Sequence, residues 1–238
     1  MEITKRQKLI LDRVIKEYIN NAEPISSQLL EKNYSFDICP ATIRIEMQKL
    51  TDGGYLLQPH TSAGRVPTDK AYRSFVNNFF EEEFSRFNED FFDEIEQIEK
   101  DLKGSLKFIQ ILTKRVAELT SGIAISYLSK EGIILKEGWE EILKEPEFKD
   151  TDYLAKFMKI MDNIEEDIEE FEIPSEMKVY IGKEIPLSGA RDFSLIISPC
   201  NFNYNSEGSL AILGPKRMAY SKNIGLIKSI TKHFSESK

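Results

Sequence analysis

The chain has 238 residues, 41% of them hydrophobic and 11% aromatic, which is enough apolar content to bury one large core or two smaller ones and excludes an unfolded chain. It has no run of about 18 apolar residues and no charged start followed by an apolar block, so we expect neither a membrane span nor a secretory signal, and we expect a cytoplasmic protein. The net charge of −8 disfavours a polyanion binder along the whole chain, and the two cysteines, Cys39 and Cys200, lack the spacing of a disulfide framework or a zinc site.

Charge is unevenly distributed along the chain. Residues 1–75 carry 11 Lys and Arg against 9 Asp and Glu, a net charge of +2. The remaining residues carry 21 basic against 31 acidic side chains, a net charge of −10. This asymmetry would confine DNA contact to the amino-terminal part, although ordinary surface charge of an acidic protein gives the same pattern.

Three short helices are predicted near the amino terminus. From Thr4, apolar residues recur at helical spacing with Lys and Arg between them, until NNAEPI ends the helix. Ser26 can cap a second helix through SQLLEK. Pro40 suits the first position of a third helix, PATIRIEMQKL, which ends at a Gly-Gly pair.

The third helix is predicted to read DNA. At about 100° per residue, Ile43, Met47 and Leu50 fall on one face, which we expect to pack inward. Small residues on the other face allow close approach to a groove, Thr and Gln can bond base edges or phosphates, and Arg can bond guanine. The outward residues are Ala41, Thr42, Arg44, Ile45, Gln48 and Lys49. Because every amphipathic helix has a polar face, the prediction depends on the order of all three helices.

A hairpin is predicted after the third helix, with strands in YLLQP (55–59) and RVPT (65–68). We expect Gly64 to adopt a positive φ at the tip and Thr68 to cap the next helix. The tip should present hydroxyls and a guanidinium to phosphates or to a narrow minor groove. The residues expected to project are His60, Thr61, Ser62 and Arg65.

His60 and Ser62 also admit a catalytic interpretation, as base and nucleophile. They lie two residues apart on a loop without an evident orienting acid, so we predict no enzyme activity. Three helices followed by a hairpin are instead typical of a winged helix-turn-helix domain, predicted here for residues 1–75.

The sequence LTDGGYLLQPHTSAGRVPTDKAYR, preceded by PATIR and by an EYI–EPI–S pattern at 17–26, resembles the amino-terminal domain of the HrcA family of bacterial heat-inducible transcription repressors. The resemblance implies a dimer bound to double-stranded DNA at an inverted-repeat operator, the CIRCE element, upstream of chaperone operons. It also implies a GroE-type chaperonin as a partner. The complete set of candidate DNA-binding residues is Ser26, Ser27, Ala41, Thr42, Arg44, Ile45, Gln48, Lys49, His60, Thr61, Ser62 and Arg65.

Two residues depart from the family pattern. Cys39 stands where members usually have Ser, so we expect a poorer helix cap. Ile45 stands where they usually have Asn, so a polar DNA contact cannot be carried over to it. An outward Ile at this position meets a thymine methyl group, packs under the hairpin or stays exposed.

Residues 76–119 are predicted to form a helical linker with an apolar seam. The seam packs against its own domain or against a second subunit, and Gly104 weakens an uninterrupted coil. Its members, spaced by three and four residues, are Ile95, Ile98, Leu102, Ser105, Ile109, Leu112, Val116 and Leu119, of which Ser105 alone is polar.

Residues 120–238 are predicted to form an α+β domain. Strands are expected at 121–128, 132–139, 178–185, 193–202 and 208–215, with an acidic helix at 152–171 and a last helix from about 221 to 234. We find no phosphate-binding loop, paired His or nucleophile motif, so no catalytic, metal or cofactor site is expected. The carboxylates at 165–172 are interpreted as a solvated helix face.

This part also resembles the HrcA family, through KEPEF at 144–148, VYIGKE at 179–184 and LAILGPKRMAYSKNI at 210–224. The resemblance implies a GAF-like regulatory domain. Members usually carry a long dimerising insertion between the strand SGIAIS and GWEEILKEPEF, whereas only residues 127–137 separate these segments here. A dimer would therefore use the GAF-like surface or the helix at 92–119. The alternative function is a small-molecule sensor with a ligand pocket in this domain.

Overall fold

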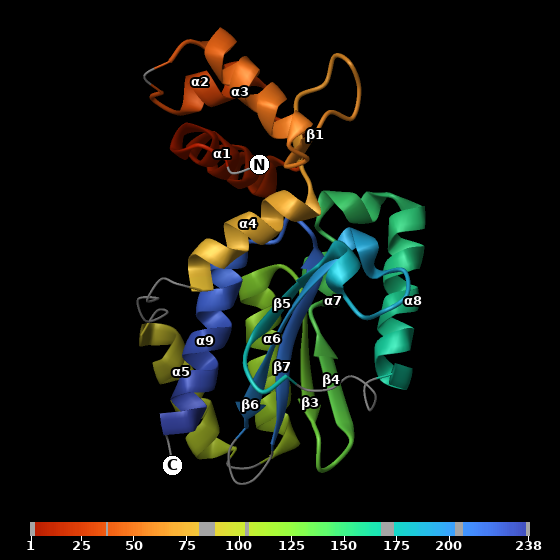
Figure 1. Ribbon diagram of the computed structural model, residues 1–238. Coiled ribbons are helices and arrows are strands. Elements are labelled where there is room, and N and C mark those ends of the chain that lie inside the picture. The colour runs from red at the N-terminus through yellow and green to blue at the C-terminus, as the bar shows by residue number, and fades with distance from the viewer. Residues whose placement is uncertain are drawn as a thin grey trace. The chain divides into compact units, whose positions relative to one another are not determined.

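A computed structural model describes residues 3–36, 38–80, 89–102, 105–167, 174–202 and 207–236 of the chain. It divides into two compact units, Met1–Glu81 and Glu82–Lys238, and each is considered by itself (Figure 1). Helices and sheet occur together, which confirms the predicted α+β class.

The amino-terminal unit contains the three predicted helices and the hairpin. Thr4 begins the first helix with a capping box, because its hydroxyl accepts from the Gln7 amide and the Gln7 side chain accepts from the Thr4 amide. Ser26 caps the second helix as predicted, accepting from the Leu29 amide at 3.1 Å. The elements are α1 (Lys5–Asn21), α2 (Ser27–Asn33), α3 (Pro40–Asp52), β1 (Leu56–Leu57), β2 (Val66–Pro67) and α4 (Asp69–Phe80).

The predicted inward face of α3 is confirmed. Ile43, Met47 and Leu50 are buried, and α3 packs against both α1 and α2. Thr68 begins α4 as predicted, because its hydroxyl accepts from the Ala71 amide at 3.3 Å and donates to the Gly54 carbonyl at 2.8 Å. The hairpin is therefore held to α3 at one end and to α4 at the other.

A buried carboxylate joins α1 to the end of α2. Glu17 accepts hydrogen bonds from the Tyr34 hydroxyl at 2.8 Å, the Asn33 side chain at 3.2 Å and the Asn21 side chain at 3.1 Å. Burial and this hydrogen bond both raise the pKa of the Tyr34 hydroxyl. Because its charge is satisfied by three donors, Glu17 can fix the start of the connection that leads to α3.

The carboxy-terminal unit is built on a five-stranded antiparallel sheet with the strand order β4-β3-β7-β6-β5. Its strands are β3 (Ile123–Leu128), β4 (Ile133–Glu137), β5 (Lys178–Ile181), β6 (Phe193–Asn201) and β7 (Glu207–Pro215). The α-helices are α5 (Glu89–Asp101), α6 (Leu106–Thr120), α7 (Trp139–Ile142), α8 (Thr151–Asp167) and α9 (Tyr220–Glu236). Short 3₁₀ turns cover Pro146–Lys149 (η1), Gly182–Glu184 (η2) and Ala190–Asp192 (η3).

Helices cover both faces of this sheet, with α6 and α9 on one side and α8 on the other (Figure 1). On the α8 side, buried apolar residues of the strands pack with Phe157, Ile160 and Met161. On the other side, Thr113 of α6 and Ser126 of β3 share a buried hydrogen bond of 2.7 Å. The unit is thus a sheet between two helical layers, each with its own contacts to the sheet.

The predicted linker seam divides between two helices. Ser105, its one polar member, is the N-cap of α6 and accepts from the Phe108 amide at 3.3 Å, while Gly104 lies outside the described residues. Ile109, Leu112 and Val116 are buried against the sheet of the same unit. For α6, packing within its own domain is therefore the interpretation that the structure supports.

Two predicted strands are shorter than expected because glycines redirect the chain. β4 ends at Glu137 because Gly138 has φ of 110°, and a Cβ on it would lie 2.3 Å from the Gly122 carbonyl oxygen. β5 ends at Ile181 because Gly182 has φ of 55° and begins the turn η2. The acidic helix α8 is described only to Asp167, and the side chains of the carboxylate cluster at 165–172 lie outside the described ones.

An ion-pair cluster joins two segments that the sequence singled out, KEPEF and LAILGPKRMAYSKNI. Arg217 forms a bidentate pair with Glu147, at 2.6 and 2.8 Å, and also donates to Glu145. The Arg217 side chain is only 9% exposed. Burial lowers the pKa of this guanidinium, but its two carboxylate partners outweigh that effect and raise it.

We expect Arg217→Met to lower the free energy of unfolding by about 2–4 kcal/mol, because it leaves two partly buried carboxylates without a cation. Urea unfolding followed by circular dichroism measures the change. Lys222→Met, at an exposed position on α9, is the control. Equal stability of the two variants would show that the cluster contributes nothing to folding.

One buried amide lacks hydrogen bonds. Asn223 on α9 is fully buried, and neither its Oδ1 nor its Nδ2 has a partner among the described residues. An unpaired buried amide costs stability, because both groups lose their hydrogen bonds to water.

Asn223→Leu is therefore expected to raise the free energy of unfolding by about 1–2 kcal/mol. The matched control is Thr113→Val, which also replaces a buried polar side chain by an apolar one of similar size. It should lower stability by about 1–3 kcal/mol, because it deprives Ser126 of its partner. Thermal and urea unfolding of both variants measure the signs, and destabilisation by Asn223→Leu would contradict the assignment.

Candidate nucleic-acid interface

The face of α3 opposite the packed residues is exposed over its whole length. Ala41, Arg44, Gln48 and Lys49 are exposed and Thr42 is half-buried. Ile45 is 56% exposed, so it does not pack under the hairpin. The structure thus brings all six predicted α3 residues to one side of the helix, and an apolar side chain lies among polar ones.

Two of the charges near this face are tied together. Glu46 is nearly buried and accepts from Lys49 Nζ at 3.1 Å and from Gln7 Nε2 at 3.0 Å. Burial raises the pKa of the Glu46 carboxyl, but the hydrogen bonds from Lys49 and Gln7 outweigh it and lower that pKa. The charge of Lys49 is therefore partly neutralised by Glu46 on the same helix. The helical spacing of the sequence did not reveal this contact.

The start of α3 has the weak cap expected from Cys39. The Cys39 side chain makes no cap hydrogen bond to the backbone, and its Sγ lies 3.4 Å from the Thr42 hydroxyl. Hydrogen bonding to Thr42 lowers the pKa of the exposed Cys39 thiol. Burial raises the pKa of the other thiol, Cys200.

We expect iodoacetamide to modify one thiol of the folded protein rapidly at neutral pH, and that thiol to be Cys39. A lowered pKa increases the thiolate fraction at pH 7, whereas Cys200 is buried and stays protonated. Mass spectrometry of the labelled peptides measures the two rates. Thr42→Val should raise the Cys39 pKa and slow the reaction near pH 7, and unchanged labelling would disprove the role of Thr42.

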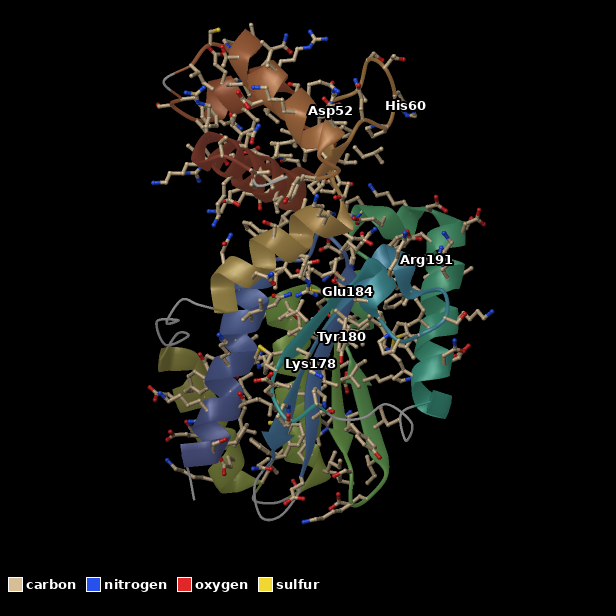
Figure 2. All side chains as sticks on the ribbon, in the orientation of Figure 1. Asp52, His60, Lys178, Tyr180, Glu184 and Arg191 are labelled. Atoms are coloured by element: carbon tan, nitrogen blue, oxygen red, sulfur yellow. The ribbon has the colours of Figure 1, made fainter. Side chains whose placement is uncertain are left out.

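The hairpin tip is shaped by a side chain that the sequence analysis missed. Gln58 Nε2 donates to the Thr61 and Ala63 carbonyls at 2.9 and 3.0 Å, and the Ala63 amide donates to the His60 carbonyl at 2.9 Å. His60, Thr61 and Ser62 are exposed, and Figure 2 shows His60 on this loop. These three residues project from the tip as predicted.

The prediction for Gly64 was wrong. Its φ is not positive, and its small size serves a close approach: a Cβ would lie 2.5 Å from the Ile25 carbonyl carbon and oxygen. Next to it, Arg65 and Ile25 form an antiparallel bridge, with N–H to carbonyl distances of 2.8 and 2.9 Å. The hairpin is therefore joined by a third extended segment, the connection between α1 and α2.

The prediction that Arg65 projects from the tip was also wrong. Its Nε donates to the Thr51 hydroxyl at 3.0 Å and its Nη2 donates to Gln48 Oε1 at 2.9 Å, so the guanidinium lies on α3. Gln48 Nε2 in turn donates to Oδ1 of Asp52 at 2.8 Å, and Asp52, labelled in Figure 2, is the last residue of α3. The remaining two candidates lie at the start of α2, where Ser26 uses its hydroxyl as a cap and Ser27 is half-buried.

Other kinds of site find little support in the described part of the chain. No group of three or more His, Cys, Asp and Glu side chains there could hold a metal ion. Every helix described is too short or too polar to cross a membrane. Figure 2 also labels Lys178, Tyr180, Glu184 and Arg191 in the carboxy-terminal unit, where the Glu184 carboxylate accepts from the Ile181 amide at 2.9 Å and so closes a local turn.

These features define an α+β protein with a small helical unit, which presents one exposed helix beside a hairpin, and a second unit built on an antiparallel sheet. A solved structure of a protein described as hypothetical has the same fold, with a TM-score of 0.77 and 21% identity over 99% of this chain and 98% of that one. The family description "HrcA protein C terminal domain" matches residues 63–224. The chain belongs to the HrcA family.

Three similar curated proteins are named heat-inducible transcription repressor HrcA. The protein of Thermodesulfovibrio yellowstonii is 26% identical over 99% of this chain and 98% of its own length, and that of Natranaerobius thermophilus is 28% identical over 97% and 95%. The protein of Geobacter sulfurreducens is 51% identical over 77 residues, which cover 32% of this chain and 22% of the relative. The first alignment runs over 350 positions whereas this chain has 238 residues, so at least 112 of those positions have no residue here.

Proposed function

We propose that the amino-terminal unit is a winged helix-turn-helix domain that binds double-stranded DNA, with α3 in the major groove and the loop between β1 and β2 as the wing. The observation that carries the proposal is the exposed face of α3, held beside the hairpin by the side chain of Arg65. The opposite face of α3 is packed, so the exposed face is the one free to enter a groove. Membership of a family whose relatives are named transcription repressors supports the same function.

We further propose that the chain is a repressor of chaperone operons. A homodimer would place one α3 in each half of a CIRCE-type inverted repeat and so block transcription until heat shock. Arg44 would bond a base, whereas the exposed tip residues His60, Thr61 and Ser62 would contact phosphates. Ser26 and Ser27, at the start of α2, would contact the sugar-phosphate backbone of the DNA.

Residues 120–238 of the carboxy-terminal unit are proposed to form a GAF-like regulatory domain. Residues 1–75 would be the DNA-binding domain, and residues 76–119 would be the helical linker between them. Its five-stranded antiparallel sheet between helical layers supports this assignment. Since this chain lacks at least 112 positions of a long relative, we propose that dimer contacts come from this unit rather than from an insertion. A GroE-type chaperonin would help the unit reach its active fold.

A fluorescently labelled CIRCE duplex is expected to bind more tightly than a scrambled duplex of equal length and composition. Arg44→Ala should weaken specific binding by about 1–3 kcal/mol and relax specificity, because it removes a base contact. Fluorescence anisotropy titration at fixed salt measures both affinities. Arg13→Ala, on α1 and outside the candidate DNA-binding residues, is the control that should bind like the unmodified protein.

Equal affinity for both duplexes would overturn the proposed function. Light scattering of the protein with and without the CIRCE duplex gives the mass of each species, so the same samples test the dimer. A monomer on the duplex would contradict dimeric binding and leave the DNA-binding assignment standing.

A further inference from the structure

Arg65 connects three segments that are far apart in the sequence. Its backbone bonds to Ile25 in both directions, at 2.8 and 2.9 Å, which ties the hairpin to the connection between α1 and α2. Its guanidinium donates from Nε to the Thr51 hydroxyl and from Nη2 to Gln48 Oε1, which ties the hairpin to α3. Thr51 is itself fixed, because its hydroxyl donates to the Met47 carbonyl at 2.9 Å. The planar fork of Arg65 thus meets two acceptors whose positions on α3 are set.

Both ends of the Gln48 amide are occupied. Its Oε1 accepts from Arg65 at 2.9 Å, and its Nε2 donates to Asp52 Oδ1 at 2.8 Å. An amide with both ends bonded has one orientation instead of two, so its donor and acceptor directions are set before any base arrives. The hydrogen bond from Gln48 also holds the Asp52 carboxylate against the helix. The position of this carboxylate matters, because a negative charge on a DNA-facing surface repels phosphates.

We propose that Arg65 is a positioning residue for sequence recognition, which sets the orientation of Gln48 and the position of the wing against α3, and that it does not act as a phosphate contact. The inference rests on the proposed function, since positioning matters only if α3 reads DNA. A phosphate contact requires a positive charge but no fixed arrangement of donors. Positioning Gln48 and the wing requires the forked guanidinium, which donates to two acceptors at once. The two roles therefore respond differently to Lys.

The substitution Arg65→Lys distinguishes the positioning role from a phosphate contact. It keeps the positive charge but cannot donate to Thr51 and Gln48 with the same geometry. We expect the ratio of affinities for the CIRCE duplex and a scrambled duplex to fall about tenfold, the size of one base contact. The slope of log affinity against log salt should stay unchanged in Arg65→Lys under either role, because the charge is kept. Arg65→Met removes the charge, so it would lower the slope by about 1 only if Arg65 contacts a phosphate. Arg13→Lys, whose arginine lies over the Tyr34 ring and outside the candidate DNA-binding residues, should change neither quantity.

A double-mutant cycle tests the link to Gln48. Gln48→Met removes the acceptor of Arg65 at nearly constant volume, so it should lower the affinity ratio alone but add little in the presence of Arg65→Met. Circular dichroism and thermal unfolding of each variant show whether the amino-terminal unit still folds. Arg65→Lys is the milder change, and its result stands even where Arg65→Met does not fold.

The outcomes distinguish the two proposals. If the unmodified protein binds both duplexes equally, the proposed function fails. If it discriminates and Arg65→Lys keeps the full affinity ratio, the positioning role is wrong. If Arg65→Met lowers the salt slope by about 1 while Arg65→Lys leaves it unchanged, Arg65 is a phosphate contact and the positioning role is again wrong.

Discussion

The close approach of two backbones at Gly64 is the constraint on which the amino-terminal unit depends. With no Cβ at this position, the hairpin comes near enough to Ile25 for residues 25 and 65 to exchange two hydrogen bonds. Once these bonds form, the side chain of Arg65 lies over α3 and meets Gln48 and Thr51. The position of the hairpin and the exposed surface of α3 are thus consequences of one missing methyl group. A two-residue strand pair would be weak alone, so this third segment supplies the stability that β1 and β2 lack.

Much of the amino-terminal unit could be predicted because its signals are local. Helical spacing correctly placed Ile43, Met47 and Leu50 inside and Ile45 outside, and Ser26 and Thr68 were identifiable as caps from their type and position. The errors at Gly64 and Arg65 share a cause, because each depends on a partner that is distant in sequence. A glycine that permits a close approach and one that adopts positive φ look alike in a sequence. An arginine beside a turn likewise gives no sign of which helix it will lie on.

The carboxy-terminal unit shows the same division between local and distant effects. Its strands were found from their apolar patterns, but their ends depended on contacts across the sheet, as at Gly138 against Gly122. Ser105 looked like a defect in a continuous seam and is the cap of a new helix. The motifs around Glu147 and Arg217 were recognisable separately, and only the fold shows that they form one ion-pair cluster. In the amino-terminal unit, helical spacing was likewise enough to predict the exposed face of α3, whereas the hydrogen bond from Gln7 to Glu46 joins residues 39 positions apart and could not be predicted.

The exposed side chain of Ile45 limits how a heat-responsive repressor of this kind could sense temperature. In the proposed complex its apolar surface would be covered by DNA, and the free energy gained by covering apolar surface increases on warming through the physiological range. This contact would therefore hold the operator more firmly in a warm cell than in a cool one. Release on heating cannot originate at this point of the interface. One place where it can originate is the folding equilibrium of the protein, whose stability decreases on heating above its temperature of maximum stability.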